Sequence, residues 1–237
     1  MKQSLFVTVI VTISCGLLWV MILAATHRGP VFDANEMVRV DGGTILDPNQ
    51  PGKEIEVSPF LIDKYEVTNA QYKKFKPEHT FSEDQADFPV TNITYEEAMA
   101  YAENLGKTLP TEAEWQLAAG AARGQKFPWG MEKRDVKVKS VSELHRVGSI
   151  PENVSPYGCF DMEGNVWEWT SDDVPATSAN NISSPTSGKK ILKGGWSQTQ
   201  KTVIAASIAD RKAQEMHKRS PQVGFRCIRR LHPSDMN

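Results

Sequence analysis

The sequence has little that would mark a nucleic-acid-binding or cysteine-stabilised protein. Its 27 lysines and arginines are balanced by 29 aspartates and glutamates, so the formal net charge is −2. This balance argues against a surface built to bind phosphate backbones, and we predict no nucleic-acid partner. Three cysteines are too few for a disulfide framework or a four-thiolate zinc site. One disulfide between Cys159 and Cys227 stays open if the compartment oxidises thiols.

Signatures of several common enzyme classes are also missing. There is no Gly-x-Ser-x-Gly nucleophile elbow and no phosphate-binding glycine loop. The five histidines are scattered without metal-ligand spacing. Apolar residues nevertheless make up 40% of the 237 residues and charged residues 24%, which is typical of a globular protein with a hydrophobic core.

An uncharged apolar run from Leu5 to Ala25 follows the first four residues. As a helix it would extend about 31 Å at ~1.5 Å per residue, which is enough to cross the core of a bilayer. We therefore predict that residues 1–25 form one transmembrane anchor, with a cleaved signal peptide as the alternative. Both interpretations place the remainder on the periplasmic or extracellular side. Residues 26–36 are predicted to be a polar linker, and residues 232–237 a tail.

Regular structure is predicted to be sparse. Three helix starts share the capping-box pattern of a threonine followed three residues later by Gln or Glu: Thr68 and Gln71, Thr94 and Glu97, Thr111 and Glu114. Short alternating runs predict strands at 37–40, 54–57, 60–67, 190–193 and 224–229. Few helices, short strands and long loops, such as the polar stretch 173–188, indicate an α+β fold.

Seven short segments stand in order along the chain: 62–69 (IDKYEVTN), 88–94 (FPVTNIT), 109–115 (LPTEAEW), 127–130 (FPWG), 157–169 (YGCFDMEGNVWEW), 194–196 (GGW) and 223–227 (VGFRC). Together they resemble the formylglycine-generating enzyme, or sulfatase-modifying factor, family. The resemblance implies that residues 37–231 form that family's variant of the C-type lectin fold. It also implies a cleft near the C-terminal third of the chain.

The segment from Asp161 to Glu168 places two carboxylates around a tight turn. Oxygen ligands from a short loop suit Ca²⁺, although a solvated Glu168 and a turn-capping Asp161 would explain the same residues. In the family, the positions that match Asp161, Gly164, Val166 and Glu168 hold a structural calcium. The resemblance therefore implies a Ca²⁺ site here, in which Gly164 and Val166 contribute only main-chain oxygens.

Oxidase members of the family convert a cysteine of a client sulfatase to formylglycine, with Cu(I) held by two cysteines shortly after the Gly-Gly pair. In this chain those positions fall near Thr199 and Ile204, and no cysteine lies between Cys159 and Cys227. Thiolates suit Cu(I), and few other side chains replace them. We therefore predict no bound copper and no oxidase activity, and we assign no catalytic residue.

The resemblance also points to three cleft residues. Where the family commonly has Gly-Gly-Ser, this chain has Trp196 before Ser197, and Arg211 matches a family arginine near the cleft. Arg211 is expected to pair a carboxylate, either that of a ligand or one of its own fold. We predict that this cleft holds a peptide or protein partner in the cell envelope. The predicted function is a binding, accessory or regulatory role in an envelope, secretion or protein-maturation pathway, and the alternative is a protein- or metabolite-modifying enzyme whose active site the sequence does not identify.

Overall fold

The computed structural model describes residues 33–50, 52–132, 144–174, 188–199, 202–205 and 207–231. For residues 196–199 and 202–205 it describes the backbone alone. The predicted anchor and tail lie outside these residues, and none of the helices described is long and apolar enough to cross a bilayer. Contacts separate the chain into Met1–Asp33 and Ala34–Asn237, and every element below belongs to the second unit.

Three α-helices begin at the predicted threonines. They are α1 (Asn69–Phe75), α2 (Tyr95–Asn104) and α3 (Glu112–Ala119). In each, the threonine hydroxyl accepts the N–H of the third helical residue, whose own side chain accepts the N–H of the threonine. The capping boxes are therefore confirmed. Two short 3₁₀ helices, η1 (Glu83–Gln85) and η2 (Ala121–Arg123), complete the helical structure described.

The strands at the two ends of the domain meet in one sheet. β4 (Phe60–Asp63) lies between β1 (Met37–Val40) and β10 (Ile228–Arg230), antiparallel to both. A separate hairpin joins β2 (Gly43–Leu46) to β3 (Glu54–Val57). The strands predicted at 37–40 and 54–57 are thus confirmed, whereas the run 60–67 is a strand only as far as Asp63.

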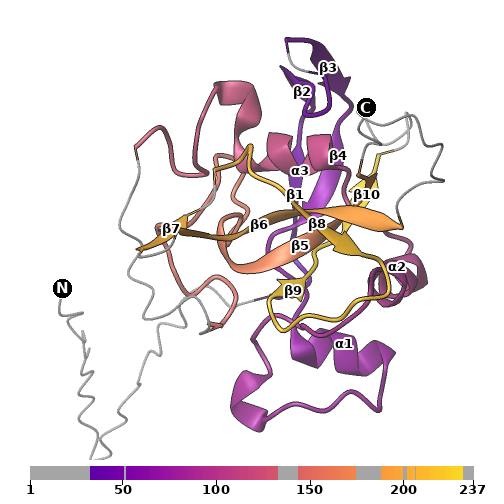
Figure 1. The fold of residues 1–237 in the computed structure, drawn as a ribbon. Coiled ribbons are helices and arrows are strands. Elements are labelled where there is room, and N and C mark those ends of the chain that lie inside the picture. The colour runs from indigo at the N-terminus through magenta and orange to yellow at the C-terminus, as the bar shows by residue number, and fades with distance from the viewer. Residues whose placement is uncertain are drawn as a thin grey trace, which may run out of the picture. The chain divides into compact units, whose positions relative to one another are not determined.

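The second sheet runs through the middle of the domain (Figure 1). Its strands are β5 (Gly164–Asp173), β6 (Lys189–Thr199), β7 (Thr202–Ala205), β8 (Lys212–Glu215) and β9 (Val223–Gly224). The order is β7-β6-β5-β9, β8 also pairs with β6, and β5 with β9 is the parallel pair. The predicted strand 190–193 lies within β6, and the run 224–229 is divided between β9 and β10.

Two clusters of buried side chains form the core. One packs α1 and α2 against β5 and the C-terminal segment, with Tyr72, Trp169 and Phe225 at its centre. The other surrounds α3 and includes Trp115 and Phe60. Trp115, Trp167 and Trp169 of the family-like motifs are buried, while Trp129 is half-buried and stacks on Phe127. The domain is a mixed α+β fold, as predicted.

Gly195 lets β6 lie close to β5, and this contact yields a first prediction. Gly195 and Gly106 both have a φ of +64°, so alanine is strained at either position. A Cβ on Gly195 would lie 2.4 Å from the Trp167 ring, whereas at Gly106 no atom lies within 4 Å. Gly195→Ala should therefore lower the free energy of unfolding by about 1–3 kcal/mol more than Gly106→Ala. Equal losses in urea denaturation would contradict this packing.

Candidate functional site

The predicted calcium loop is buried at the start of β5. Asp161 has a φ of +56° and no solvent exposure. Its Oδ2 atom accepts the N–H of Gly148 at 2.6 Å. Its Oδ1 atom has no hydrogen-bond partner in the described part of the chain and lies 3.5 Å from His145 Nε2. Gly164 and Val166 are the first and third residues of β5 and are both buried.

Glu168 forms a buried ion pair with the side chain of Arg226. Its Oε2 atom accepts Arg226 Nε at 2.8 Å and Trp115 Nε1 at 2.8 Å, and its Oε1 atom accepts Arg226 Nη2 at 2.8 Å. Both side chains of this two-pronged pair are fully buried. Burial opposes the charge of Arg226, but the carboxylate of Glu168 outweighs it and raises the pKa of the guanidinium.

A third buried carboxylate, Glu66, lies in the same region. Asn165 Nδ2 donates to its Oε2 atom at 2.7 Å, while its Oε1 atom has no partner among the described residues. Burial, together with the charges of Asp161 and Glu168, raises the pKa of Glu66 well above its ordinary value. Of the three acidic residues, Glu168 is the one that is bonded to the guanidinium of Arg226 among the described contacts. Glu66 lies within the 62–69 motif, but no sequence pattern marked it as a site residue.

The donor set of this region fits a hard cation. Two buried oxygens, Asp161 Oδ1 and Glu66 Oε1, have no hydrogen-bond partner among the described residues, and the charges of Asp161 and Glu168 both act on Glu66. Oxygen ligands and excess negative charge are what Ca²⁺ requires. Such a site depends on main-chain oxygens as well, because the described residues contain no cluster of three or more His, Cys, Asp and Glu side chains arranged to hold a metal.

Both cysteines of the described region are free thiols in the core. Cys159 and Cys227 have no solvent exposure. Burial raises the pKa of Cys159 to about 11 and that of Cys227 well above its ordinary value. Both thiols are therefore protonated at neutral pH, and a buried protonated thiol is a poor copper ligand.

The two positions that match the copper cysteines lie in the β6–β7 hairpin. Thr199 pairs with Thr202, and Ile204 pairs with Ser197. The backbone of Trp196, next to Ser197, pairs with Ala205. The hairpin thus brings the predicted cleft position Ser197 opposite one of the former ligand positions.

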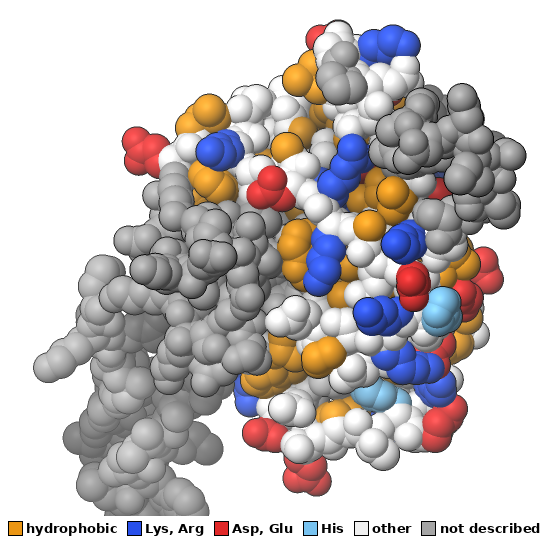
Figure 2. All heavy atoms as spheres, viewed as in Figure 1, with side chains coloured by type: hydrophobic (Ala, Val, Ile, Leu, Met, Phe, Trp, Pro, Cys, Tyr) orange, Lys and Arg blue, Asp and Glu red, His pale blue; other side chains and the backbone are white. Residues whose placement is uncertain are grey.

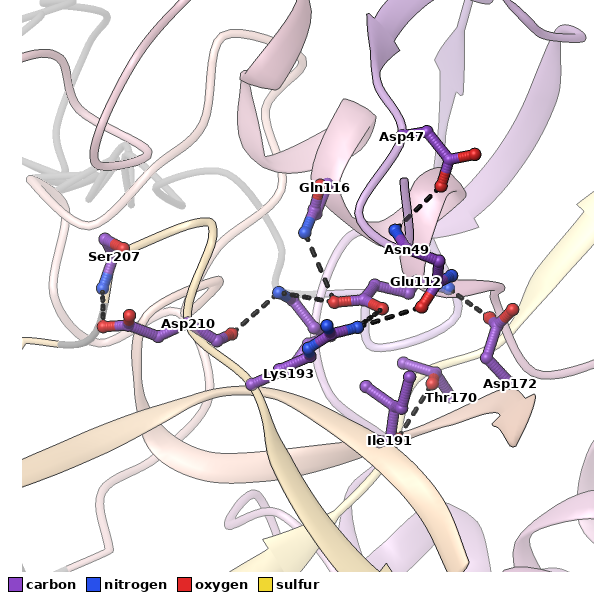
Figure 3. A network of polar contacts seen from close by, with 11 residues as sticks. Asp47, Asn49, Glu112, Gln116, Thr170, Asp172, Ile191, Lys193, Ser207 and Asp210 are labelled. Carbon is purple, nitrogen blue, oxygen red and sulfur yellow. Dashed lines mark hydrogen bonds and ion pairs between the residues drawn. The ribbon is translucent and has the colours of Figure 1, made fainter. Parts of the chain in front are cut away.

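Arg211, the third predicted cleft residue, pairs with a carboxylate of its own fold. It precedes β8, and its Nη1 atom donates to Glu112 Oε2 at 3.2 Å and to Asn49 Oδ1 at 3.0 Å. Its side chain remains 40% exposed, whereas that of Glu112 is 1% exposed. Arg211 therefore lies at the surface of a buried polar network, part of which Figure 3 shows.

Lys193 is the centre of that network and was not predicted. Its Nζ atom donates to the Asp210 main-chain oxygen at 2.7 Å and to Glu112 Oε1 at 3.3 Å, while Asp172 accepts the N–H of Glu112 (Figure 3). Its side chain is completely buried. Burial lowers the pKa of Lys193 to about 8, although Glu112 acts in the opposite direction. A sequence signal existed, because Lys193 interrupts an apolar strand directly before the Gly-Gly pair.

A second unpaired acid lies close to this network. Glu163 is 2% exposed, and neither carboxylate oxygen has a partner in the described part of the chain. Burial, assisted by the charge of Asp210, raises the pKa of Glu163 to about 9, so the group is protonated at neutral pH.

Basic side chains spread over the face on which β8 lies, with acidic groups interspersed (Figure 2). Four charged or titratable side chains that follow Arg211 are exposed: Lys212, His217, Lys218 and Arg219. Arg219 makes a two-pronged pair with Glu97, at 2.6 and 2.8 Å.

The fold and these motifs agree with known proteins. The sequence profile described as the sulfatase-modifying factor enzyme 1-like domain matches residues 24–231. The chain belongs to this family. The resemblance stated above is therefore confirmed.

Relatives of this sulfatase-modifying-factor domain include proteins named as enzymes and proteins named as inactive. A formylglycine-generating enzyme of Thermomonospora curvata is 26% identical over an alignment that covers 85% of this chain and 95% of the relative. An inactive C-alpha-formylglycine-generating enzyme 2 of Bos taurus is 25% identical, over 76% of this chain and 80% of the relative. The crystal structure of CarF shares the fold, with a TM-score of 0.64, 18% identity and coverage of 83% of this chain and 98% of CarF.

The buried state of Lys193 predicts a specific pH dependence. Because its pKa is lower in the folded state than in the unfolded chain, the unfolded state binds more protons between about pH 8 and pH 10.5. The contribution of Lys193 to stability should therefore rise with pH in this window, by at most about 1.4 kcal/mol per unit. Lys193→Met should remove this rise, and Lys189→Met, at an exposed position on the same strand, should keep it. If the free energy of unfolding changed with pH in the same way in the wild type and both variants, Lys193 would not be desolvated.

Proposed function

We propose that this domain acts as a binding or accessory domain without oxidase activity, held by an N-terminal anchor on the extracytoplasmic side of a membrane. One observation carries the proposal. The residues that match the copper ligands lie near Thr199 and Ile204, and neither is a cysteine. The two cysteines elsewhere in the described domain are protonated thiols in the core. We infer that the chain retains the scaffold and lacks the ligands for copper chemistry.

The partner would bind where the β6–β7 hairpin meets the Lys193–Glu112 network. Trp196 lies three residues beyond Lys193 on β6, and Arg211 precedes the strand that pairs with the other half of β6. Tryptophan and arginine are both common anchors of protein interfaces, so a peptide segment is a suitable partner for these two positions. The name of the cattle relative offers a precedent for a family member without activity.

A second function, modification of a protein or metabolite, has one observation in its favour. Lys193 and Glu163 both have strongly perturbed pKa values and lie close to the same residue, Asp210. Such groups often mark catalytic sites. Lys193 is fully buried and holds structural partners, so we favour the binding function.

The test compares the full-length chain with two double variants. Trp196→Ala/Arg211→Ala alters the proposed cleft, and Trp129→Ala/Arg230→Ala makes the same changes elsewhere. Crosslinking in the membrane fraction should capture the same partners with the wild type and the second variant, and lose them with the first. If the first variant captured the same partners as the wild type, the cleft would not be the binding site. In parallel, wild-type protein with Cu(I) and a cysteine-containing sulfatase peptide should yield no aldehyde, and aldehyde formation would refute the non-oxidase function.

We also propose that Asp161 and Glu168, with the main-chain oxygens of Gly164 and Val166, hold a structural Ca²⁺. The Oδ1 atom of Asp161, which has no hydrogen-bond partner among the described residues, supports this, and Glu168 would share its Oε1 atom between Ca²⁺ and Arg226. A bound Ca²⁺ would supply charge compensation at the start of β5. The protein's own residues would orient the carboxylates, since Gly148 and Trp115 each hold one of them by a hydrogen bond.

After chelation, adding Ca²⁺ at about 100 times its Kd should stabilise the wild-type domain by about 2.7 kcal/mol. For a domain of this size the melting temperature should rise by about 5–10 °C. Asp161→Ala should abolish the rise. Asp210→Ala, which also removes a carboxylate that accepts one backbone N–H, should preserve it. A melting temperature that does not respond to Ca²⁺ in any of the three proteins would refute a bound ion.

A further inference from the structure

A cavity of about 400 Å³ lies away from both sites described above. Its walls come from α1, the segment between α1 and α2, the first turn of α2, and the residues Leu144 and Arg219. None of the predicted cleft or calcium residues contributes to it. A volume of this size suits a small organic molecule or one end of a peptide.

One end of the cavity carries an excess of hydrogen-bond donors. Glu97 accepts four of them: Lys76 Nζ, Arg219 Nη1 and Nη2, and the N–H of Thr94. Lys76 uses one of its three N–H groups in the hydrogen bond to Glu97. Arg219 uses three of its five, two toward Glu97 and one from Nη1 to the Asn92 main-chain oxygen. Within the described part of the chain, the acceptors of Glu97 are thus filled, and both cations keep N–H groups that no described residue accepts.

Two cations and two acidic residues line this end, and among the described residues only one of the acids lies closer than 4.0 Å to either cation. Lys76 and Arg219 share the single carboxylate of Glu97. The other acidic residue of the wall, Glu78, lies 4.0 Å from Lys76 with its side chain 70% exposed. A pair of that length in solvent compensates little charge. The donor-rich end of the cavity is therefore suited to an anionic group with two oxygens.

The remaining wall mixes polar side chains, among them Asn69, Gln85 and Asn92, with an aromatic and apolar part made by Phe81, Phe88, Ile93 and Leu144. His79 adds a ring whose centroid lies 5.6 Å from that of Phe81. Its Nε2 atom meets Asn69 Oδ1 at 2.8 Å, and because the Asn69 amide nitrogen donates to the Gln85 oxygen, Nε2 must carry the proton. Burial and the neighbouring lysines lower the pKa of His79, so the ring is neutral and adds no charge to this wall.

We propose that this cavity binds a small organic carboxylate with an aromatic or apolar body, with the carboxylate against Lys76 and Arg219 and the body against Phe81 and Phe88. The C-terminal residue of a peptide and a free small acid share this chemistry. The site is separate from the proposed cleft, so it can exist whether or not the cleft binds a partner.

The test uses the full chain in detergent and two probes that differ only in the carboxylate, N-acetyl-phenylalanine and its amide. Calorimetry, with blank titrations into detergent alone, should show the acid binding at least about tenfold more tightly, because hydrogen bonds to a charged group are strong. A peptide that ends in phenylalanine separates the two sources. If this peptide binds more tightly than N-acetyl-phenylalanine, the natural ligand is a peptide C-terminus. If it binds equally or more weakly, the natural ligand is a free small acid. Equal affinity for acid and amide, or no binding of the acid at about 5 mM, overturns the proposal.

Two matched variants locate the site. Lys76→Met removes one of the two cations, and Lys74→Met makes the same change at an exposed position of α1 that does not line the cavity. Lys76→Met should weaken binding of the acid by about tenfold or more and leave binding of the amide unchanged. Lys74→Met should change neither. A matched melting temperature shows that each variant is folded, and equal affinity of the two variants for the acid would place its binding elsewhere.

Discussion

The buried ion pair between Arg226 and Glu168 connects segments that are far apart in the sequence. Glu168 lies on β5, and the other N–H groups of Arg226 donate to main-chain oxygens of Asp63, Lys64 and Phe160. Trp115 of α3 binds the same carboxylate. Both charges are fully buried, so each is tolerable only while the other is present. The small sheet, the central sheet and α3 therefore share one electrostatic constraint, and the loop that leads into β5 inherits its position from it.

Sequence patterns predicted the elements whose stabilising contacts are local. The capping boxes at Thr68, Thr94 and Thr111 use atoms three residues apart, so the pattern and the structure agree. β5 was not predicted as a strand, because its first seven residues are all buried and the usual alternation is missing. β9 was predicted only as part of a longer run, since its pairing with β5 depends on residues more than fifty positions away.

The same distinction holds for the candidate site. The motif around Asp161 and Glu168 drew attention to a segment that is indeed buried and charged. Glu112 lies in the first turn of α3, where an acid favours the helix dipole, but its side chain also binds Lys193 and Arg211. Those partners are about 80 and 100 residues away in sequence, and only the folded arrangement of α3 against β6 and β8 reveals them.

The pairing of the chain's last described strands has a consequence for how the domain is made. β10 completes the small sheet by pairing with β4, and β9 completes the central sheet by pairing with β5. Arg226, between them, supplies the cation for Glu168. Neither sheet can reach its final form until this segment has been synthesised. Contacts of such long sequence separation form slowly. A chaperone that shields β4 and β5 during this interval would therefore have more influence on the yield of this domain than on its final stability.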